Sequence, residues 1–258
     1  MTPLGSTQES LTRGTANDER QARLQLAAMY RVFALLDWNE LIYSHITLRV
    51  PGEAHRFLIN PYGLHYSEVT ASNLVKIDLE GNIVGHSDWP INPAGFVIHS
   101  ALHGARPDVS CIAHTHTPAG VAVACQEAGL RMENLYAALC YGRVAYHDFE
   151  GITVRPDERA RLVASLGRKD LLILRHHGLL ACGPTVAAAF QNLWILQRAC
   201  EFQVAARSGG APVRTISEEV CGRSADALKA MHAHAGYGEL EFAALVRQVD
   251  RIDSSWRA

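Results

Sequence analysis

Two histidines stand one residue apart in the segment CIAHTHTP, residues 111–118. The apolar residues around them are typical of a short β-strand, in which side chains two positions apart lie on the same face. His114 and His116 would then project together, at a spacing that lets both imidazoles bind one cation. The same pair also suits an ordinary strand face with one half-buried and one exposed histidine. This pattern alone leaves both interpretations open.

A third imidazole is available in LRHHGLLACGPT, residues 174–185. His177 follows an apolar strand and precedes Gly178, which permits a sharp turn. Strand ends are where α/β sheets present functional groups, and three histidines would leave coordination positions open for water and substrate. Because adjacent strand residues face opposite ways, spacing does not decide between His176 and His177. Both could instead simply cap the strand.

The composition narrows the class of protein. The formal net charge is −2, which gives no basic footprint for nucleic acid and no polybasic membrane anchor. No apolar run reaches the roughly 18 residues that a membrane span needs. The six cysteines form no CxxC pair, and the N-terminus lacks the apolar core of a secretory signal. We therefore expect reduced thiols, a cytoplasmic location, and no nucleic-acid or membrane partner.

Hydrophobic periodicity predicts an α/β chain with hairpins in its first half and helices interleaved later. Strands are expected at 43–52, 55–63, 109–117, 142–149 and 171–182, the last being a pair broken at Gly178, with a hairpin at 74–85. Helices are expected at 17–36, 95–105, 118–126, 157–167, 186–207, 225–234 and 239–249. No long linker or repeat divides the chain.

These segments resemble the class II aldolase/adducin family, which includes the fuculose-phosphate and ribulose-phosphate enzymes. The matching stretches occur in family order over about residues 20–210: SHITLRVPG, LINPYGLHYSEVT with VKIDLEGNIV, FVIHSALHGARPDV, CIAHTHT and LLILRHHGLLACG. The C-terminal FAALVRQVDRIDSSWRA resembles the end of the bacterial adducin-like branch. The resemblance implies an α/β fold: a single three-layer α/β/α domain over 17–210 with a largely antiparallel central sheet. A disordered arm is expected at 1–16, and a helical extension packed on the same domain at 211–258.

The resemblance also implies a metal site. His114 and His116 match the paired ligands of the family and His177 matches the third, while the family usually has Asn where this chain has His176. A divalent metal is expected, zinc first, with manganese or iron as alternatives. The family is typically a ring of four subunits with sites at their borders, so a homotetramer is expected.

Two departures from the sugar-phosphate aldolases concern the substrate. Those enzymes carry a glutamate that serves as acid/base and fourth ligand, and the matching position here is Gly95, which cannot move a proton. Two serines that donate to the substrate phosphate correspond to Pro93 and Ala94. A phosphorylated sugar is therefore disfavoured. We expect a small unphosphorylated oxo or hydroxy acid.

Other residues are candidates by position, each with an ordinary structural role as its alternative. The candidate proton donors are His45, Tyr62, His99 and His176. Arg175 could pair with a substrate carboxylate, and Tyr136 lies where the family often brings an aromatic residue to a neighbouring subunit's site.

Three functions fit these features. The first is a metal-dependent lyase that performs aldol-type cleavage or decarboxylation through a metal-stabilised enolate. The second is a non-haem iron(II) oxygenase, since three histidines with open positions also suit oxygen chemistry. The third is a non-catalytic adducin-like assembly module, which the Gly95 departure favours and the complete set of three ligands disfavours.

Overall fold

The central sheet runs through the whole domain. The computed structural model describes residues 5–152, 155–231 and 236–258, and within them the strand order is β3-β2-β1-β4-β7-β6-β5. The strands are β1 His45–Arg49, β2 Arg56–Ile59, β3 Val75–Asp78, β4 Cys111–Thr115, β5 Val144–His147, β6 Leu171–Leu174 and β7 Gly178–Gly183. Only the pairing of β5 with β6 is parallel among these strands. The predicted, largely antiparallel sheet is confirmed.

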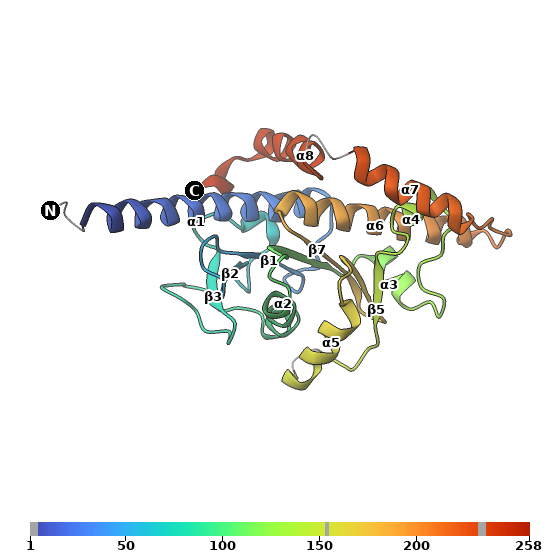
Figure 1. Cartoon of the computed structure of the whole chain (residues 1–258), viewed down its shortest axis with the longest axis horizontal. Coiled ribbons are helices and arrows are strands. Elements are labelled where there is room, and N and C mark those ends of the chain that lie inside the picture. Colours follow the sequence, from blue (N-terminus) through green and yellow to red (C-terminus); the bar gives the residue numbers. More distant parts are fainter. Residues whose placement is uncertain (1–4, 153–154, 232–235) are drawn as a thin grey trace.

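Helices cover both faces of this sheet (Figure 1). They are α1 Gly5–Leu35, α2 Pro93–Ala105, α3 Pro118–Ala124, α4 Leu135–Leu139, α5 Arg159–Leu166, α6 Val186–Ser208, α7 Glu218–Met231 and α8 Glu239–Ile252, with 3-10 turns at Tyr66–Glu68, Pro156–Glu158 and Ser255–Arg257. The long helices α1 and α6 lie on one face, and α2 and α5 lie on the other, which confirms the predicted three layers. Helices α7 and α8 lie outside α1 and α6.

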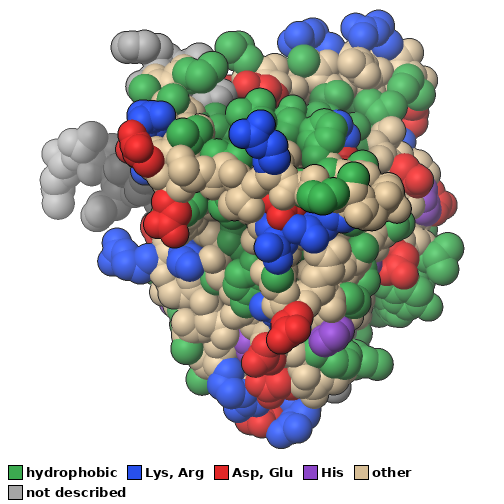
Figure 2. Space-filling view, turned by 90° about the vertical axis from the view of Figure 1, so that its right-hand side faces the viewer, with side chains coloured by type: hydrophobic (Ala, Val, Ile, Leu, Met, Phe, Trp, Pro, Cys, Tyr) green, Lys and Arg blue, Asp and Glu red, His purple; other side chains and the backbone are tan. Residues whose placement is uncertain are grey.

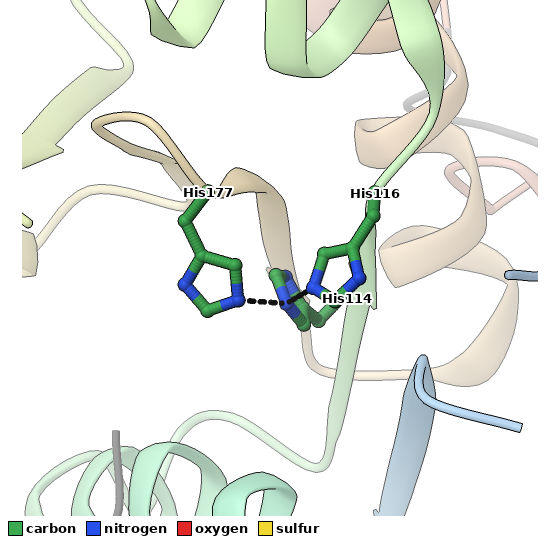
Figure 3. Close-up of side chains that lie close together, drawn as sticks. All are labelled: His114, His116 and His177. Atoms are coloured by element: carbon green, nitrogen blue, oxygen red, sulfur yellow. Dashed lines mark hydrogen bonds between the residues drawn. The ribbon is translucent and has the colours of Figure 1, made fainter. Parts of the chain in front are cut away.

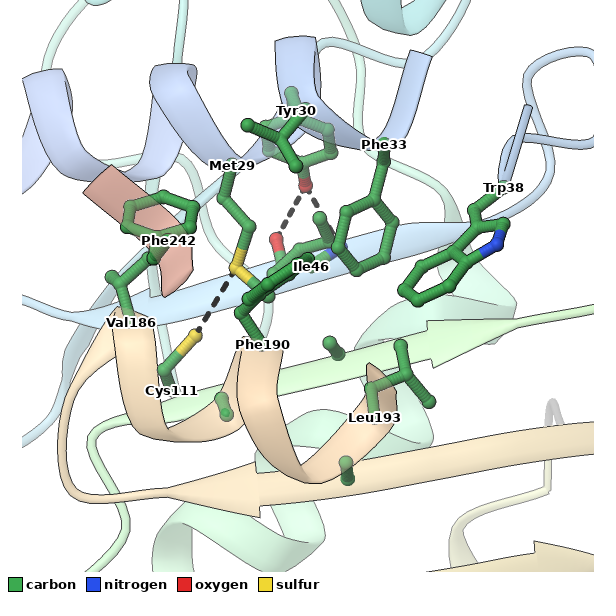
Figure 4. Close-up of a cluster of buried hydrophobic side chains, with 14 of the residues drawn as sticks. Met29, Tyr30, Phe33, Trp38, Ile46, Cys111, Val186, Phe190, Leu193 and Phe242 are labelled. Atoms are coloured by element: carbon green, nitrogen blue, oxygen red, sulfur yellow. Dashed lines mark hydrogen bonds between the residues drawn. The ribbon is translucent and has the colours of Figure 1, made fainter. Parts of the chain in front are cut away.

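The larger part of the core lies between the sheet and the helices α1 and α6 (Figure 4). Phe33 of α1 and Phe190 of α6 are fully buried there, and burying a side chain of this size contributes about 1.5–3 kcal/mol. The hydroxyl of Tyr30 accepts from the Ile46 amide at 2.8 Å and bonds to the Asn60 side chain at 3.0 Å. This hydroxyl therefore ties α1 to β1 and to the residue after β2.

The alternation of side chains along β4 decides where its histidine points. Cys111 and Ala113 belong to the core under α1 and α6, whereas Ile112 belongs to the cluster under α2 and α5. Because successive side chains of a strand face opposite sides, His114 shares the α2 side with Ile112. His45 pairs directly with His114 across β1 and β4, so it lies on that side too.

The structure differs from the sequence predictions at several places. A disordered arm was expected over residues 1–16, but residues 5–16 form the first part of helix α1. No proline interrupts the sequence from Gly5 to Leu35, so the backbone can stay helical. Residues 1–4 lie outside the described residues, as do 232–235 at the end of the helix expected at 225–234. The second arm of the hairpin at 74–85 pairs with β3 only at the bridge Ile77–Ile83. The short helix α4 was not predicted.

The C-terminal segment lies against α1. Trp256 is buried, the Ala71 amide donates to its carbonyl at 2.8 Å, and Arg31 of α1 forms an ion pair with Asp253 at 2.9 Å.

Within the described ranges, no helix has both the length and the hydropathy needed to cross a membrane. On the face drawn in Figure 2, acidic and basic side chains are interspersed with apolar ones.

A substitution at Gly178 tests the close approach of β7 to β4. A Cβ on this residue would lie 2.2 Å from the backbone oxygen of Thr115, so G178A should force the strands apart and lower the free energy of unfolding by about 2 kcal/mol. Urea unfolding of chelator-treated protein measures this loss. The control is G222A in α7, where a Cβ meets nothing within 4 Å and helix propensity should leave stability equal or higher. Equal midpoints for G178A and wild type would contradict the packing described.

Candidate metal centre

The pairing of β4 with β7 brings the three predicted ligands to one edge of the sheet. His114 pairs with Leu180, so the end of β4 lies beside the turn that joins β6 to β7. His116 follows the last residue of β4, and His177 lies in that turn. Figure 3 shows the three rings meeting from these two segments. Strand pairing therefore brings His177 to the two histidines of the other segment.

The three imidazoles present their Nε2 atoms to one another. The His114 Nε2 lies 2.8 Å from that of His116 and 3.2 Å from that of His177, and all the ligand atoms lie within 4.8 Å of one another. Nitrogen atoms around a tetrahedral zinc ion are about 3.4 Å apart, given Zn–N bonds of about 2.0–2.1 Å. This donor set fits a divalent cation bound by three nitrogen atoms, with positions left over for other ligands.

The outer nitrogens of two of these rings are held by acceptors. The Nδ1 of His114 donates to the carbonyl oxygen of Leu179 at 2.8 Å, and the Nδ1 of His116 donates to a carboxylate oxygen of Glu40 at 2.5 Å. Since both acceptors lack a proton to give, each ring carries its hydrogen on Nδ1 and keeps the Nε2 lone pair free. Outer acceptors of this kind orient metal-binding histidines and raise their basicity.

Burial keeps the ligands in the form that binds metal. Removal from water, together with the neighbouring imidazoles His116 and His177, lowers the pKa of His114 well below its ordinary value. Burial, with a smaller contribution from His116, lowers the pKa of His177 to about 4. A neutral imidazole is the ligand, so these shifts favour metal binding at neutral pH.

The cluster faces a pocket of about 450 Å³, a size typical of small-molecule sites. Its lining residues are Glu40, Tyr43, His45, Tyr62, Asn92, Pro93, Ile98, His114, His116, Phe149, Gly151, Ile152 and His177. Tyr43, Phe149 and Ile152 are exposed at its rim. A larger cavity of about 590 Å³ lies at the opposite ends of β1 and β4, but its lining, as far as the structure describes it, contains no histidine or cysteine. We assign the site to the smaller pocket because it contains the metal-binding groups.

Two of the predicted proton donors, His45 and Tyr62, line this pocket. The His45 ring lies 5.3 Å from the His114 ring and 4.3 Å from the His99 ring, measured between centroids. Burial lowers the pKa of His45 to about 3, so it is neutral at physiological pH. Gly95 lies directly against it: a Cβ built there would be 2.7 Å from the Cγ of His45.

Four other predicted residues do not line the pocket. His99 is buried behind His45, where its Nδ1 bonds to the Thr47 hydroxyl at 2.7 Å. His176 is exposed, with a left-handed backbone at φ 57° that turns it away from His177. This conformation also suits asparagine, the usual family residue there.

Arg175 and Tyr136 are occupied elsewhere. Arg175 donates to the Gln126 carbonyl at 2.7 Å and stacks over Tyr146, so it fastens the loop after α3. Tyr136 stacks on Phe202 of α6 at a centroid distance of 5.7 Å. Within one chain neither reaches the pocket, and a role for Tyr136 at a neighbouring subunit's site stays a prediction.

Sequence reasoning missed the residues that loops bring to the site. Glu40 lies 76 positions before His116, and Phe149 and Ile152 follow β5. No spacing rule links them to the histidines, because their position depends on how the loops fold over the sheet. An isolated glutamate after a predicted helix gave no usable signal.

Removal of the Glu40 carboxylate should weaken metal binding. E40Q leaves the three ligands in place but exchanges a charged acceptor for a weaker one, so zinc affinity should fall about 10- to 100-fold. A competitive titration against a chromophoric chelator measures this affinity. E241Q, at an exposed carboxylate of α8, is the matched control and should bind zinc as the wild type does. Equal affinities for E40Q and E241Q would contradict the role given to Glu40.

The metal-free protein should lose stability on acidification. The folded-state pKa values of His177 and His45, about 4 and about 3, lie below the ordinary value of 6.5, so the unfolded chain binds protons first as the pH falls. Their contribution to stability is complete above about pH 6.5 and disappears as the pH falls towards 3. Urea unfolding between about pH 7.5 and about pH 4 measures this slope. H45F should make it shallower, and an unchanged slope would refute the assignment.

Known proteins resemble this chain along most of its length. The profile described as "Class II Aldolase and Adducin N-terminal domain" matches residues 24–204. Alpha-adducin of Rattus norvegicus is 42% identical over an alignment of 266 positions, which covers 98% of this chain and 36% of the adducin.

Solved structures share the fold. An aldolase II superfamily protein from Pseudomonas syringae has 44% identity and a TM-score of 0.89 over 93% of this chain and 96% of its own. The L-fuculose 1-phosphate aldolase from Glaciozyma antarctica has 26% identity and a TM-score of 0.83 over 95% of this chain and 94% of its own. The chain therefore belongs to the class II aldolase and adducin family.

Proposed function

We propose that this protein is a metal-dependent lyase that acts on a small oxo or hydroxy acid by aldol-type cleavage or decarboxylation. The observation that carries the proposal is the cluster of His114, His116 and His177, whose free Nε2 atoms meet at the floor of a pocket. Zinc is the first choice of metal because three imidazoles suit it, with manganese or iron as alternatives.

The residues of this chain have separate tasks in the proposed reaction. The three histidines hold the cation, and Glu40 keeps the His116 ring in its binding tautomer. When bound, a divalent cation supplies Lewis acidity that polarises a carbonyl group and stabilises developing negative charge. The apolar side chains of Phe149 and Ile152 border the pocket, where they can exclude water and contact an apolar part of the substrate.

The lining of the pocket supports a substrate without phosphate. Among the described residues that line the pocket there is no lysine or arginine, and Pro93 at the start of α2 has no N–H to donate. Within the described part of the lining Glu40 is the only residue with a carboxylate, and it bonds to His116. The carboxylate of an oxo or hydroxy acid could instead be neutralised by the cation itself. We infer that the substrate differs from the sugar phosphate in the name of the Glaciozyma enzyme.

An adducin-like assembly module is the second candidate. The 42% identity to alpha-adducin favours it, although this chain spans about a third of that protein. A scaffold has no need for three converging imidazoles with oriented outer nitrogens, so we rank it below the lyase. The homotetramer expected from the family stays a prediction, which light scattering can check.

Metal analysis and substrate profiling test the proposed function together. Protein purified without chelator should contain about one zinc or manganese ion per chain and cleave or decarboxylate members of a panel of 2-oxo and 2-hydroxy acids. H177A should lose both the metal and the activity because two imidazoles rarely suffice for tight binding. H86A, at an exposed histidine outside the pocket, is the control that should keep both.

Three different results would contradict the proposed function. Iron together with oxygen consumption would indicate an oxygenase. Protein without metal and without activity would indicate an assembly module. Turnover of sugar phosphates alone would refute the substrate class.

A further inference from the structure

Gly95 and His45 share one space beside the metal centre. Gly95 lies in the first turn of α2 and is buried against β1. A Cβ on it would be 2.7 Å from the Cγ of His45 and 2.8 Å from both Cδ2 and Nδ1, closer than side chains pack. Its φ is not in the left-handed region, so backbone freedom does not explain the glycine. The glycine is required because the imidazole of His45 fills the space that a side chain at 95 would need.

The surroundings of His45 determine which of its nitrogens is available. Its Nδ1 lies 3.5 Å from the carbonyl oxygen of Tyr43, an atom that can only accept, so the proton belongs on Nδ1. The Nε2 of the neutral ring is then an acceptor. This atom is buried and has no hydrogen-bond partner among the described residues, in a side chain only 3% exposed. A buried acceptor without a partner is unfavourable unless a ligand or a water molecule satisfies it.

The position of His45 in the pocket indicates that a bound ligand is the partner of its Nε2 atom. His45 lines the pocket and pairs directly with the metal-ligand candidate His114 across β1 and β4. A small acid held at the three-histidine centre would therefore lie next to this ring. An acceptor there selects a ligand that offers a hydroxyl hydrogen.

We propose that the Nε2 of His45, whose ring occupies the space that Gly95 leaves, accepts a hydrogen bond from the hydroxyl of a 2-hydroxy acid. This inference rests on the proposed function and narrows its substrate class to acids that carry a 2-hydroxyl group in addition to the carbonyl group that the cleavage requires. It also gives a reason for the glycine at position 95: the group beside the proposed metal comes from β1 in this chain, and α2 contributes a glycine that makes room for it.

Binding of lactate and pyruvate to the zinc- or cobalt-loaded protein tests the inference without reference to turnover. The two acids match in size and charge, and only lactate carries the hydroxyl. H45F keeps an aromatic ring next to Gly95 but removes the acceptor, so it should bind lactate about tenfold more weakly and pyruvate about equally well. Calorimetry, or the visible spectrum of the cobalt protein, measures both affinities. Equal effects of H45F on the two acids, or no effect on either, would overturn the inference.

Gly95 provides an independent variant in case H45F does not fold. G95A should displace the His45 ring and weaken lactate binding about as much as H45F does. In an H45A background the added Cβ meets no ring, so G95A should cause no further loss, and the double-mutant cycle should show strong coupling. Additive losses would overturn the pairing of these residues. A wild-type protein that binds no metal would instead refute the proposed function, which separates the two failures.

Discussion

The close contact between β4 and β7 is the constraint on which the site depends. Gly178 begins β7 against the backbone of Thr115, where no side chain fits, and the register then places Leu179 and Leu180 opposite Thr115 and His114. This approach carries the preceding residue, His177, to the histidines of β4. The same register lets the Leu179 carbonyl fix the His114 tautomer. The contact between β4 and β7 therefore determines the position of His177 and the tautomer of His114.

Much of the sheet and the placement of the ligand histidines could be predicted, because both follow from local sequence patterns. The period of two along 111–118 places His114 on the face opposite Ala113, and the apolar run broken at Gly178 gives the strand pair β6 and β7. The choice between His176 and His177 could not be made from spacing, since it depends on a left-handed residue in the turn. Glu40 could not be found either, because a loop folded over the sheet brings it to His116.

Gly95 shows a different limit of sequence reasoning. The resemblance to the sugar-phosphate aldolases implies that an acid is missing there, and position along the chain separately makes His45 a candidate for the site. The sequence does not indicate that the His45 ring occupies the space of a side chain at position 95. That conclusion requires the packing of α2 on β1 and the distance between the two residues. The exchange of that acid for the His45 ring replaces an anionic side chain by a neutral imidazole. A cation bound by three neutral ligands keeps its charge for the substrate, with Glu40 as the carboxylate nearest to those ligands in the lining.

The proposed function depends on the binding of one divalent cation by three imidazoles of one chain. The X-ray absorption spectrum of zinc bound to the purified protein tests it most directly, because scattering from imidazole rings is distinct from that of water or carboxylate. Three imidazole nitrogen atoms are expected at about 2.0–2.1 Å, with oxygen ligands completing the shell. A shell of oxygen atoms alone, or a single imidazole, would contradict it.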